Sequence, residues 1–293
     1  MNNSGYGTHL LPYFCNMSFI KNIGVFYVNA NIHVALAASC MVLITGTVFD
    51  IAVFEASLFV GFSTVLAYNF IRFLKYKAAA LRQDMRHWFE RNRMKVCLLT
   101  FVCFFGVLFL SFFMKPIALL LLTPFVSIVV LYMTPVFPHG IVKKSLRNLP
   151  FVKIFSIGLT WSGACVLFPI FQSGRALDCS VWLYFVYQFL FVLLWTLPFD
   201  IRDMAQDKKG MKTIPQVLGI AMTKIMGISI LLLLLFVSFL LFENALFLLF
   251  CIGHLFLSVA LLFSKGKQTP FYASFWVESI PIGQYILFAC MDL

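Results

Sequence analysis

The stretch Ile228–Leu240, ISILLLLLFVSFL, is one of several continuous apolar blocks in this chain. A strand of a membrane β-barrel would instead alternate in polarity over segments of about 10 residues. Only helices and closed barrels satisfy their backbone hydrogen bonds in lipid. The stretch therefore predicts a membrane-spanning helix, which needs roughly 20 mostly apolar residues.

The composition of the whole chain agrees with this prediction. Of its 293 residues, 62% are hydrophobic and 11% are charged, and the mean hydropathy is +0.96. An ordinary soluble domain carries about 25% charged residues, so this chain cannot cover a surface with water-compatible side chains. The composition excludes a soluble enzyme, and it excludes a disordered chain, which needs low hydrophobicity. We expect an all-α, polytopic membrane protein.

Apolar blocks bounded by charged residues or proline predict about nine transmembrane helices. Their approximate ranges are 25–46, 50–71, 95–114, 117–134, 151–171, 180–199, 218–241, 244–263 and 270–290.

The basic residues predict the orientation of these helices. The chain has 22 Lys and Arg and a net charge of +11, and the nine-helix arrangement leaves only Lys115 and Arg175 away from the other 20. Basic residues stay on the cytoplasmic side of polytopic proteins, so the charge indicates topology rather than nucleic-acid binding. We expect a cytoplasmic N-terminus and a C-terminus across the membrane, in the bacterial inner (plasma) membrane. The eight cysteines fit no metal or disulfide pattern.

The segment Leu197–Gly219, LPFDIRDMAQDKKGMKTIPQVLG, carries the clearest chemical signal. Asp200, Asp203 and Asp207 share one face if the sixth helix continues through them, with Arg202 on another side. The dipole at a helix C-terminus disfavours anions, so the three acids need a cation. Neighbouring lysines meet that need, and so does Mg²⁺, which is held by one or two carboxylates together with substrate phosphates.

The same segment resembles a known family motif. The pattern DxxDxxxDxxGxxTxPxxLG at the end of the sixth helix is similar to the second aspartate motif of the UbiA superfamily of membrane prenyltransferases. The helix count and the predicted cytoplasmic position of the motif are also similar. The matching residues are Asp200, Asp203, Asp207, Gly210, Thr213, Pro215, Leu218 and Gly219.

The resemblance implies a single UbiA-like transmembrane domain over residues 1–293 and a prenyltransferase activity. It implies transfer of an isoprenyl group from a prenyl diphosphate to a lipophilic acceptor, such as an aromatic or quinone precursor. Asp200, Asp203 and Asp207 would then hold Mg²⁺. The expected partners are the prenyl diphosphate, the acceptor and membrane lipids, with no nucleic acid. No residue is assigned a catalytic role beyond binding.

The chain departs from the family at the first aspartate motif. Family members end the second helix in a pattern such as NDxxDxxxD, whereas this chain has AYNFIRFLKYK at 67–77 and no acid between Glu55 and Asp84. Arg72, Lys75 and Lys77 either bind the diphosphate directly in place of a metal, since Arg binds phosphate oxygens bidentately, or are cytoplasmic anchors. We assign Asn69, Arg72 and Lys212 to diphosphate binding. Lys75 and Lys77 are interpreted as anchors at the membrane surface.

Two further residues and two alternative functions complete the predictions. Lys153 points either to a polar cavity or to the lipid headgroups, and the headgroups are the favoured interpretation. Glu278 is a functional candidate because acids within membrane spans are costly. Loss of the first motif favours a diverged, non-catalytic protein of the same fold that binds a lipid or quinone. The third hypothesis is a small-molecule transporter with Glu278 at its centre. It ranks after prenyl transfer and after lipid or quinone binding.

Overall fold

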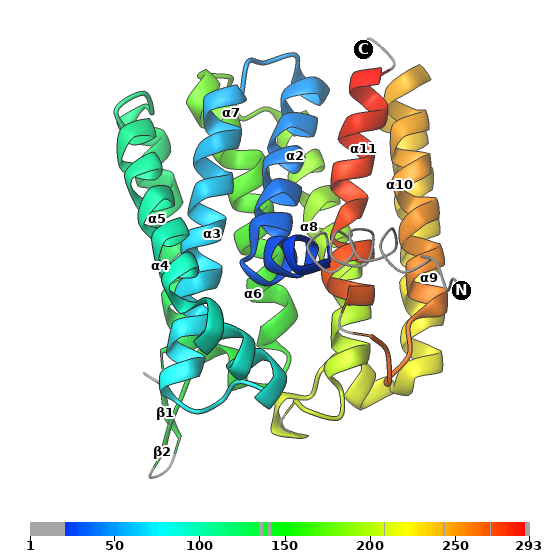
Figure 1. Ribbon diagram of the computed structural model, residues 1–293. Helices are drawn as coiled ribbons and strands as arrows, with labels where there is room; N and C mark the ends of the chain where they lie inside the picture. The colour runs from blue at the N-terminus through cyan, green and yellow to red at the C-terminus, as the bar shows by residue number, and fades with distance from the viewer. Residues whose placement is uncertain are drawn as a thin grey trace, which may run out of the picture.

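The computed structural model describes residues 21–134, 137–139, 142–207, 209–242, 244–269 and 271–290 as a bundle of long helices (Figure 1). The α-helices are α2 (Ile32–Phe49), α3 (Phe54–Lys77), α4 (Gln83–Ser111), α5 (Pro116–Met133), α6 (Val152–Ser162), α7 (Phe168–Ser173), α8 (Cys179–Asp203), α9 (Ile214–Leu241), α10 (Asn244–Phe263) and α11 (Ser279–Cys290). The shorter elements are β1 (Phe137–His139), β2 (Val142–Lys144), the 3₁₀ turns η1 (Leu146–Asn148) and η3 (Lys209–Met211), and the π-helical turns η2 (Gly163–Leu167) and η4 (Tyr272–Val277).

The helices confirm the all-α, polytopic class. Among the described residues, seven helices are long and apolar enough to cross a membrane, with α6, η2 and α7 acting as one of them. A shorter apolar helix spans Pro116–Tyr132. Two short strands, β1 and β2, pair as an antiparallel ribbon outside the bundle (Figure 1). The count of nine spans stays a prediction.

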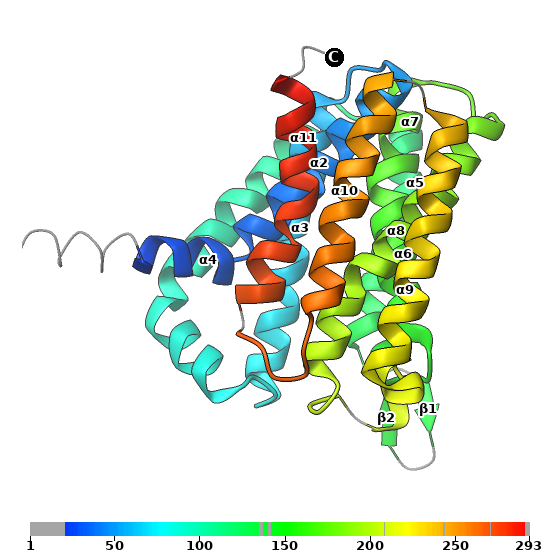
Figure 2. The same cartoon turned by 90° about the vertical axis from the view of Figure 1, so that its right-hand side faces the viewer.

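Backbone geometry corrects the limits of the first predicted span, 25–46. Residues 21–29 are helical, but they lie across the bundle rather than along it (Figure 2). Asn31 then adopts a left-handed conformation with φ 66°, and α2 begins at Ile32. Asn tolerates this conformation better than most residues, and it ends the first helix where the apolar pattern gave no signal.

The connections between helices segregate the basic residues. The loops joining α3 to α4, α5 to α6, α8 to α9, and α10 to α11 all lie at the lower end of Figure 1, which we call the basic end. Lys115 and Arg175 lie in connections at the opposite end, near the C-terminus (Figure 1). The basic end therefore gathers the cationic segments, and its cytoplasmic location stays a prediction.

Side chains from other helices satisfy backbone carbonyls released in the two π-helical turns. The Thr45 hydroxyl donates to the Cys165 carbonyl in η2 (2.8 Å), and the Trp195 indole N–H donates to the Val277 carbonyl in η4 (2.7 Å). Lipid offers no water to such carbonyls, so partners within the bundle are required. These bonds tie α2 to η2 and α8 to η4.

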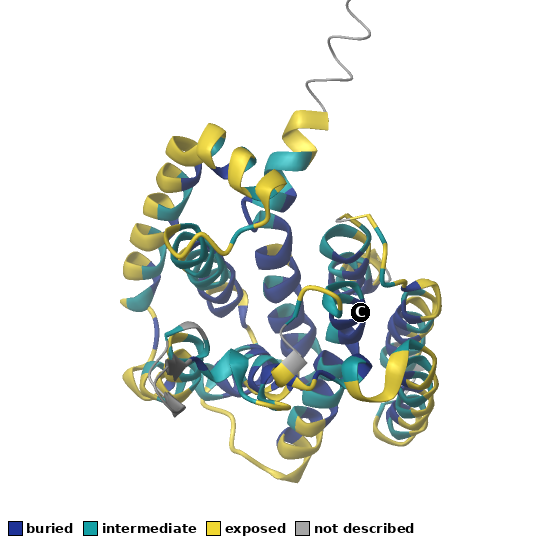
Figure 3. Ribbon diagram, turned by 90° about the horizontal axis from the view of Figure 1, so that it is seen from below, coloured by how far each residue is buried: buried dark blue, intermediate teal, exposed yellow. Residues whose placement is uncertain are grey.

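Apolar side chains cover the outside of the bundle as well as its interior. Figure 3 shows buried faces turned inward and exposed faces turned outward. The outer helix α4 carries many of the exposed aromatics, including Phe101, Phe105 and Phe109. Such a surface is compatible with the lipid tails, because exposing apolar side chains to hydrocarbon carries no hydrophobic penalty.

Close packing at Gly163 generates a stability prediction. A Cβ placed there would lie 2.3 Å from the Phe125 ring, whereas a Cβ at Gly283 would meet nothing within 4 Å. We expect Gly163→Ala to lower the free energy of unfolding by about 1–3 kcal/mol through overpacking. Gly283→Ala is the matched control, and it should leave stability unchanged or raise it by about 0.5–1 kcal/mol. Chemical unfolding in mixed micelles measures both variants, and equal stabilities would contradict the packing.

Candidate functional site at the basic end

A buried lysine joins two of the predicted aspartates. Lys153, in the first turn of α6, places its Nζ 2.8 Å from Asp200 Oδ1 and 2.5 Å from Asp207 Oδ2. Arg147 adds a third cationic contact, 3.4 Å from Asp207 Oδ1. The side chains of Lys153, Asp200 and Asp207 are at most 9% exposed. The prediction that Lys153 reaches the headgroups is wrong, because two carboxylates hold it inside the bundle.

Local backbone contacts bring these residues together. The Asp207 N–H donates to the Asp203 carbonyl (2.8 Å), which places Asp207 one turn beyond the end of α8. The Phe151 N–H donates to the Met211 carbonyl (3.0 Å), and this bond holds the start of α6 beside the segment after α8. Lys153 therefore reaches both acids from a helix that is distant in the sequence.

Much of the second aspartate motif has a structural role. Thr213 caps α9, and its N–H donates to the Gln216 Oε1 (3.1 Å) in a capping box. Gln216 also donates to the Asp207 carbonyl (3.0 Å), which ties the aspartate segment to α9. Gly219 has φ 77° and lies where α9 changes direction, a conformation that glycine adopts without penalty.

Asp203 has a different partner from the other two aspartates. Its carboxylate accepts from Arg202 Nε (2.7 Å) and Nη2 (3.0 Å), and Arg202 also donates to Ser274 Oγ near η4 (3.3 Å). The expectations that Arg202 lies on another side, and that one continuous helix face carries all three acids, are therefore wrong. The helix ends at Asp203, and the long guanidinium folds back onto its neighbour.

The end of α3 contributes an arginine held by two asparagines. Arg72 donates to Asn69 Oδ1 (3.2 Å) and to Asn31 Oδ1 (2.9 Å), while Asn31 Nδ2 donates to Asn69 Oδ1 (2.7 Å). Asn69 in turn donates to Thr100 on α4 (3.1 Å). Arg72 has no carboxylate partner in the part of the chain that the structure describes. The structure thus places Asn69 and Arg72 in contact, while their role in diphosphate binding stays a prediction, and Asn31 is a member that the sequence did not reveal.

Lys75 lies within electrostatic range of Arg72 in the α3 group and of the aspartate group. It is half-buried, and within the described ranges it has no hydrogen bond or ion pair. It lies within electrostatic range of Asp203, Arg147 and Lys153. Lys77, by contrast, is exposed and stacks over the Phe73 ring (4.7 Å), which fits the predicted anchor.

We refer to these charged residues together as the basic-end cluster. Among these eight described side chains, which do not include Glu278 beside Arg202, five cations face three carboxylates and leave two positive charges in excess. The cations are Arg72, Lys75, Arg147, Lys153 and Arg202, and the carboxylates are Asp200, Asp203 and Asp207. The arrangement is suited to a ligand that carries several negative charges.

Lys212 lies apart from the α3 group. It is exposed, has a left-handed backbone with φ 48°, and lines a small pocket with Lys153 and Asp200. The pocket has room for about one water molecule. Among the described contacts, none joins Lys212 to Asn69 or Arg72, so the structure brings together two of the three predicted diphosphate ligands.

The three aspartates, as they are arranged, do not fit a Mg²⁺ site. Mg²⁺ is held by one or two carboxylates that are free to coordinate it, together with substrate phosphates, and over the described chain no group of three acids, histidines or cysteines could hold a metal ion. Each carboxylate already binds a cationic side chain, and only Asp200 Oδ2 lacks a hydrogen-bond partner. Any of the three carboxylates would have to lose or share its cationic partner before it could bind a metal ion.

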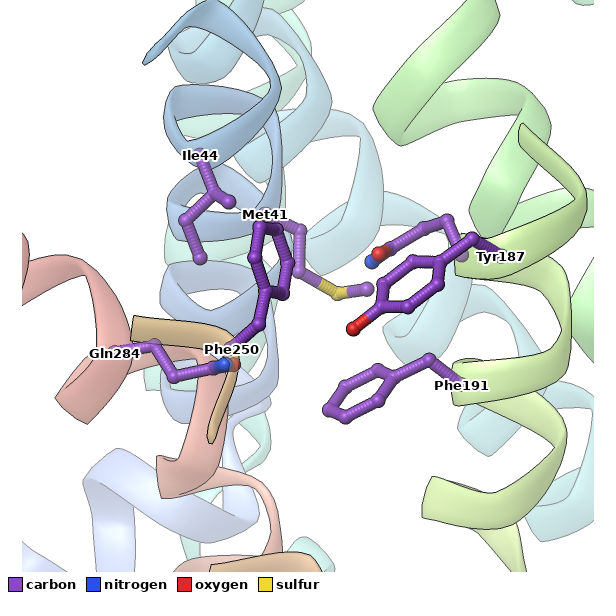
Figure 4. A pocket seen from close by; sticks show the side chains of 7 residues that line it. Met41, Ile44, Tyr187, Phe191, Phe250 and Gln284 are labelled. Atoms are coloured by element: carbon purple, nitrogen blue, oxygen red, sulfur yellow. The ribbon is translucent and has the colours of Figure 1, made fainter. Parts of the chain in front are cut away.

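A second pocket lies deeper in the bundle, between α2, α8, α10 and α11 (Figure 4). Met41, Phe191 and Gln284 line it, together with Tyr187, whose hydroxyl lies 3.1 Å from His254 Nε2. Tyr187 is 13 positions from Asp200, or about 20 Å along α8. This pocket is therefore separate from the basic-end cluster.

Glu278 lies between η4 and α11, on the side of the cluster. It is half-buried and within electrostatic range of Arg202, and Tyr68 on α3 lies within range of it in turn. Arg202, a member of the cluster, is therefore also within electrostatic range of Glu278, the acid predicted to lie within the membrane.

The ion pairs of Lys153 generate a second prediction. Lys153→Met would leave two buried carboxylates without their main cation, and we expect a loss of about 3–5 kcal/mol in unfolding free energy. Adding Asp200→Asn to this variant should recover part of the loss. Lys212→Met is the control, because its exposed side chain should contribute less than about 0.5 kcal/mol. If Lys153→Met had the same free energy of unfolding as wild type, the result would contradict these ion pairs.

Comparison with known proteins agrees with this architecture at the level of fold. No protein-family model and no curated protein matches the chain. A solved structure of a UbiA homolog from Archaeoglobus fulgidus, bound to GPP and Mg²⁺, matches with a TM-score of 0.58 and 12% identity. The match covers 90% of this chain and 100% of the homolog. The predicted resemblance is confirmed: this chain has a UbiA-like membrane fold.

Proposed function

We propose that the protein is a membrane prenyltransferase that binds a prenyl diphosphate at the basic-end cluster. The observation that carries the proposal is the excess of cations that converge from α3, α6 and α8 at one end of a UbiA-like bundle. The fold supports the choice of ligand, because the Archaeoglobus fulgidus homolog was solved with GPP. The acceptor would be a lipophilic molecule, such as an aromatic or quinone precursor.

Arg72 is the principal diphosphate ligand in this proposal. Its two bonds to asparagine oxygens hold the guanidinium in place and leave other N–H groups free to donate. A positioned guanidinium binds phosphate oxygens bidentately, and charge-assisted bonds of this kind are about twice as strong as neutral ones. Asn69 orients Arg72, and Lys75 adds a point charge nearby.

The proposed reaction breaks the bond between the allylic carbon and the diphosphate oxygen. The bonding electron pair leaves with the diphosphate, and the cations of the cluster stabilise the charge that develops on it. The allylic carbon then forms a new bond to the acceptor, which releases a proton. Asp200 and Asp207 position Lys153, and Asp203 positions Arg202, so that both cations face the leaving group.

Binding without transfer is the second candidate function. It is favoured by a specific observation: the end of α3 carries Phe70, Phe73 and Lys77 where family members carry acids, and the aspartates at the end of α8 and just beyond it are already ion-paired. A non-catalytic protein would bind the diphosphate and release no product with any acceptor.

Substitution of Arg72 tests the proposed ligand site. We expect wild-type protein in nanodiscs to bind radiolabelled geranyl diphosphate, and Arg72→Met to bind at least about tenfold more weakly, because a hydrogen bond to a charged group contributes about 1.5–3 kcal/mol. Lys77→Met, which removes an exposed cation from the same helix, is the matched control and should bind like wild type. Failure of the wild type to bind would contradict the proposed function.

A further inference from the structure

We propose that the basic-end cluster holds the prenyl diphosphate with its own cationic side chains and without a divalent metal ion. The inference rests on the proposed function, because it describes how the same site binds its substrate. It departs from the homolog of the same fold, which was solved with GPP and Mg²⁺. The residues of this chain supply the reasons.

The α3 side of the cluster offers no carboxylate. The sequence has no acid between Glu55 and Asp84, so the oxygens at the end of α3 come from the side-chain amides of Asn69 and Asn31. Both amide oxygens already accept from Arg72, and Asn69 Oδ1 also accepts from Asn31 Nδ2. A metal ion that bridged α3 and α8 would meet the Arg72 guanidinium, and no carboxylate, on the α3 side.

The α8 side offers carboxylates that are already neutralised. Lys153 binds Asp200 and Asp207 together, and Arg202 binds Asp203 through two nitrogens. A Mg²⁺ ion bound by Asp200 and Asp207 would have to displace Lys153 or share its carboxylates at close range. Like charges at such distances repel strongly in a site with little water.

The net charge of the cluster completes the argument. With five cations against three carboxylates, the cluster carries two positive charges before any ligand arrives. A divalent metal would raise that excess to four, whereas the diphosphate brings negative charges that offset the existing excess. The side chains therefore take the place of the metal in neutralising the substrate.

Binding measurements with and without metal test the inference. Wild-type protein in nanodiscs would be titrated with radiolabelled geranyl diphosphate, either in EDTA or in millimolar Mg²⁺. We expect the two dissociation constants to agree within about fivefold. Binding that weakens more than fivefold in EDTA, or occurs in Mg²⁺ only, would overturn the inference and leave the proposed function standing. Absence of binding under both conditions would instead refute the proposed function.

A substitution at Asp203 separates the two cases, because metal-free binding and metal-dependent binding predict opposite changes in affinity for the diphosphate. Asp203→Asn removes one negative charge but keeps a side-chain oxygen that can accept from Arg202, so the inference predicts binding equal to wild type or up to about fivefold tighter. If Asp203 were a metal ligand, the same variant would bind at least about tenfold more weakly. Lys75→Met is the matched opposite change, and we expect it to weaken binding about fivefold or more. Melting temperatures of all variants exclude misfolding as the cause.

Paramagnetic resonance of Mn²⁺ gives a direct readout that does not depend on binding of the substrate. We expect the free-ion signal of Mn²⁺ to persist when the wild-type protein is added in nanodiscs, and to respond equally to wild type and Asp203→Asn. Loss of the signal with wild type, and its return with Asp203→Asn, would place a metal at the cluster and overturn the inference.

Discussion

The ion pairs of Lys153 with Asp200 and Asp207 organise the end of the bundle where the candidate site lies. Two buried carboxylates at the C-terminal end of a helix oppose the helix dipole and lack bulk water, so they require a cation at short range. Lys153 meets this requirement from α6, and Arg147 supports it from η1. As a result, α6, α8 and the segment that leads into α9 have fixed positions relative to one another, and the remaining cations of the cluster project around them.

A second constraint comes from the membrane itself. Backbone carbonyls released in the π-helical turns η2 and η4 need donors from neighbouring helices, because lipid offers none. Thr45 and Trp195 supply them, and His33 Nε2 lies 3.0 Å from the Phe275 carbonyl in η4. Turns of this kind are frequent at functional sites, and η4 borders the cluster through the contact of Ser274 with Arg202. The same local irregularity therefore serves both packing and the placement of a cation.

The sequence predicted the membrane class, the segregation of charge and the importance of the aspartate segment, since each of these depends on composition or on short-range spacing. It did not predict the partners of the aspartates. Lys153 precedes Asp200 by 47 positions and reads as an ordinary residue at the start of a span, and only the tertiary fold shows that it lies against two acids. Asn31 was missed for a similar reason, because its contacts with Asn69 and Arg72 join two helices. Arg202 was misplaced because helical spacing puts it on another side of α8, whereas its long guanidinium folds back onto the carboxylate of the neighbouring Asp203.

The central claim is that cationic side chains from both sides of the basic end grip the diphosphate directly. A structure of the protein in nanodiscs with an unreactive thio-analogue of geranyl diphosphate, determined with Mg²⁺ in the buffer, tests this claim most directly. The account predicts phosphate oxygens within hydrogen-bond distance of Arg72 and Lys75 on α3 and facing Lys153 and Arg202, with the Lys153 ion pairs intact and no metal density at the site. Metal density coordinated by Asp200 or Asp207, with Lys153 displaced, or phosphates bound elsewhere, would contradict it.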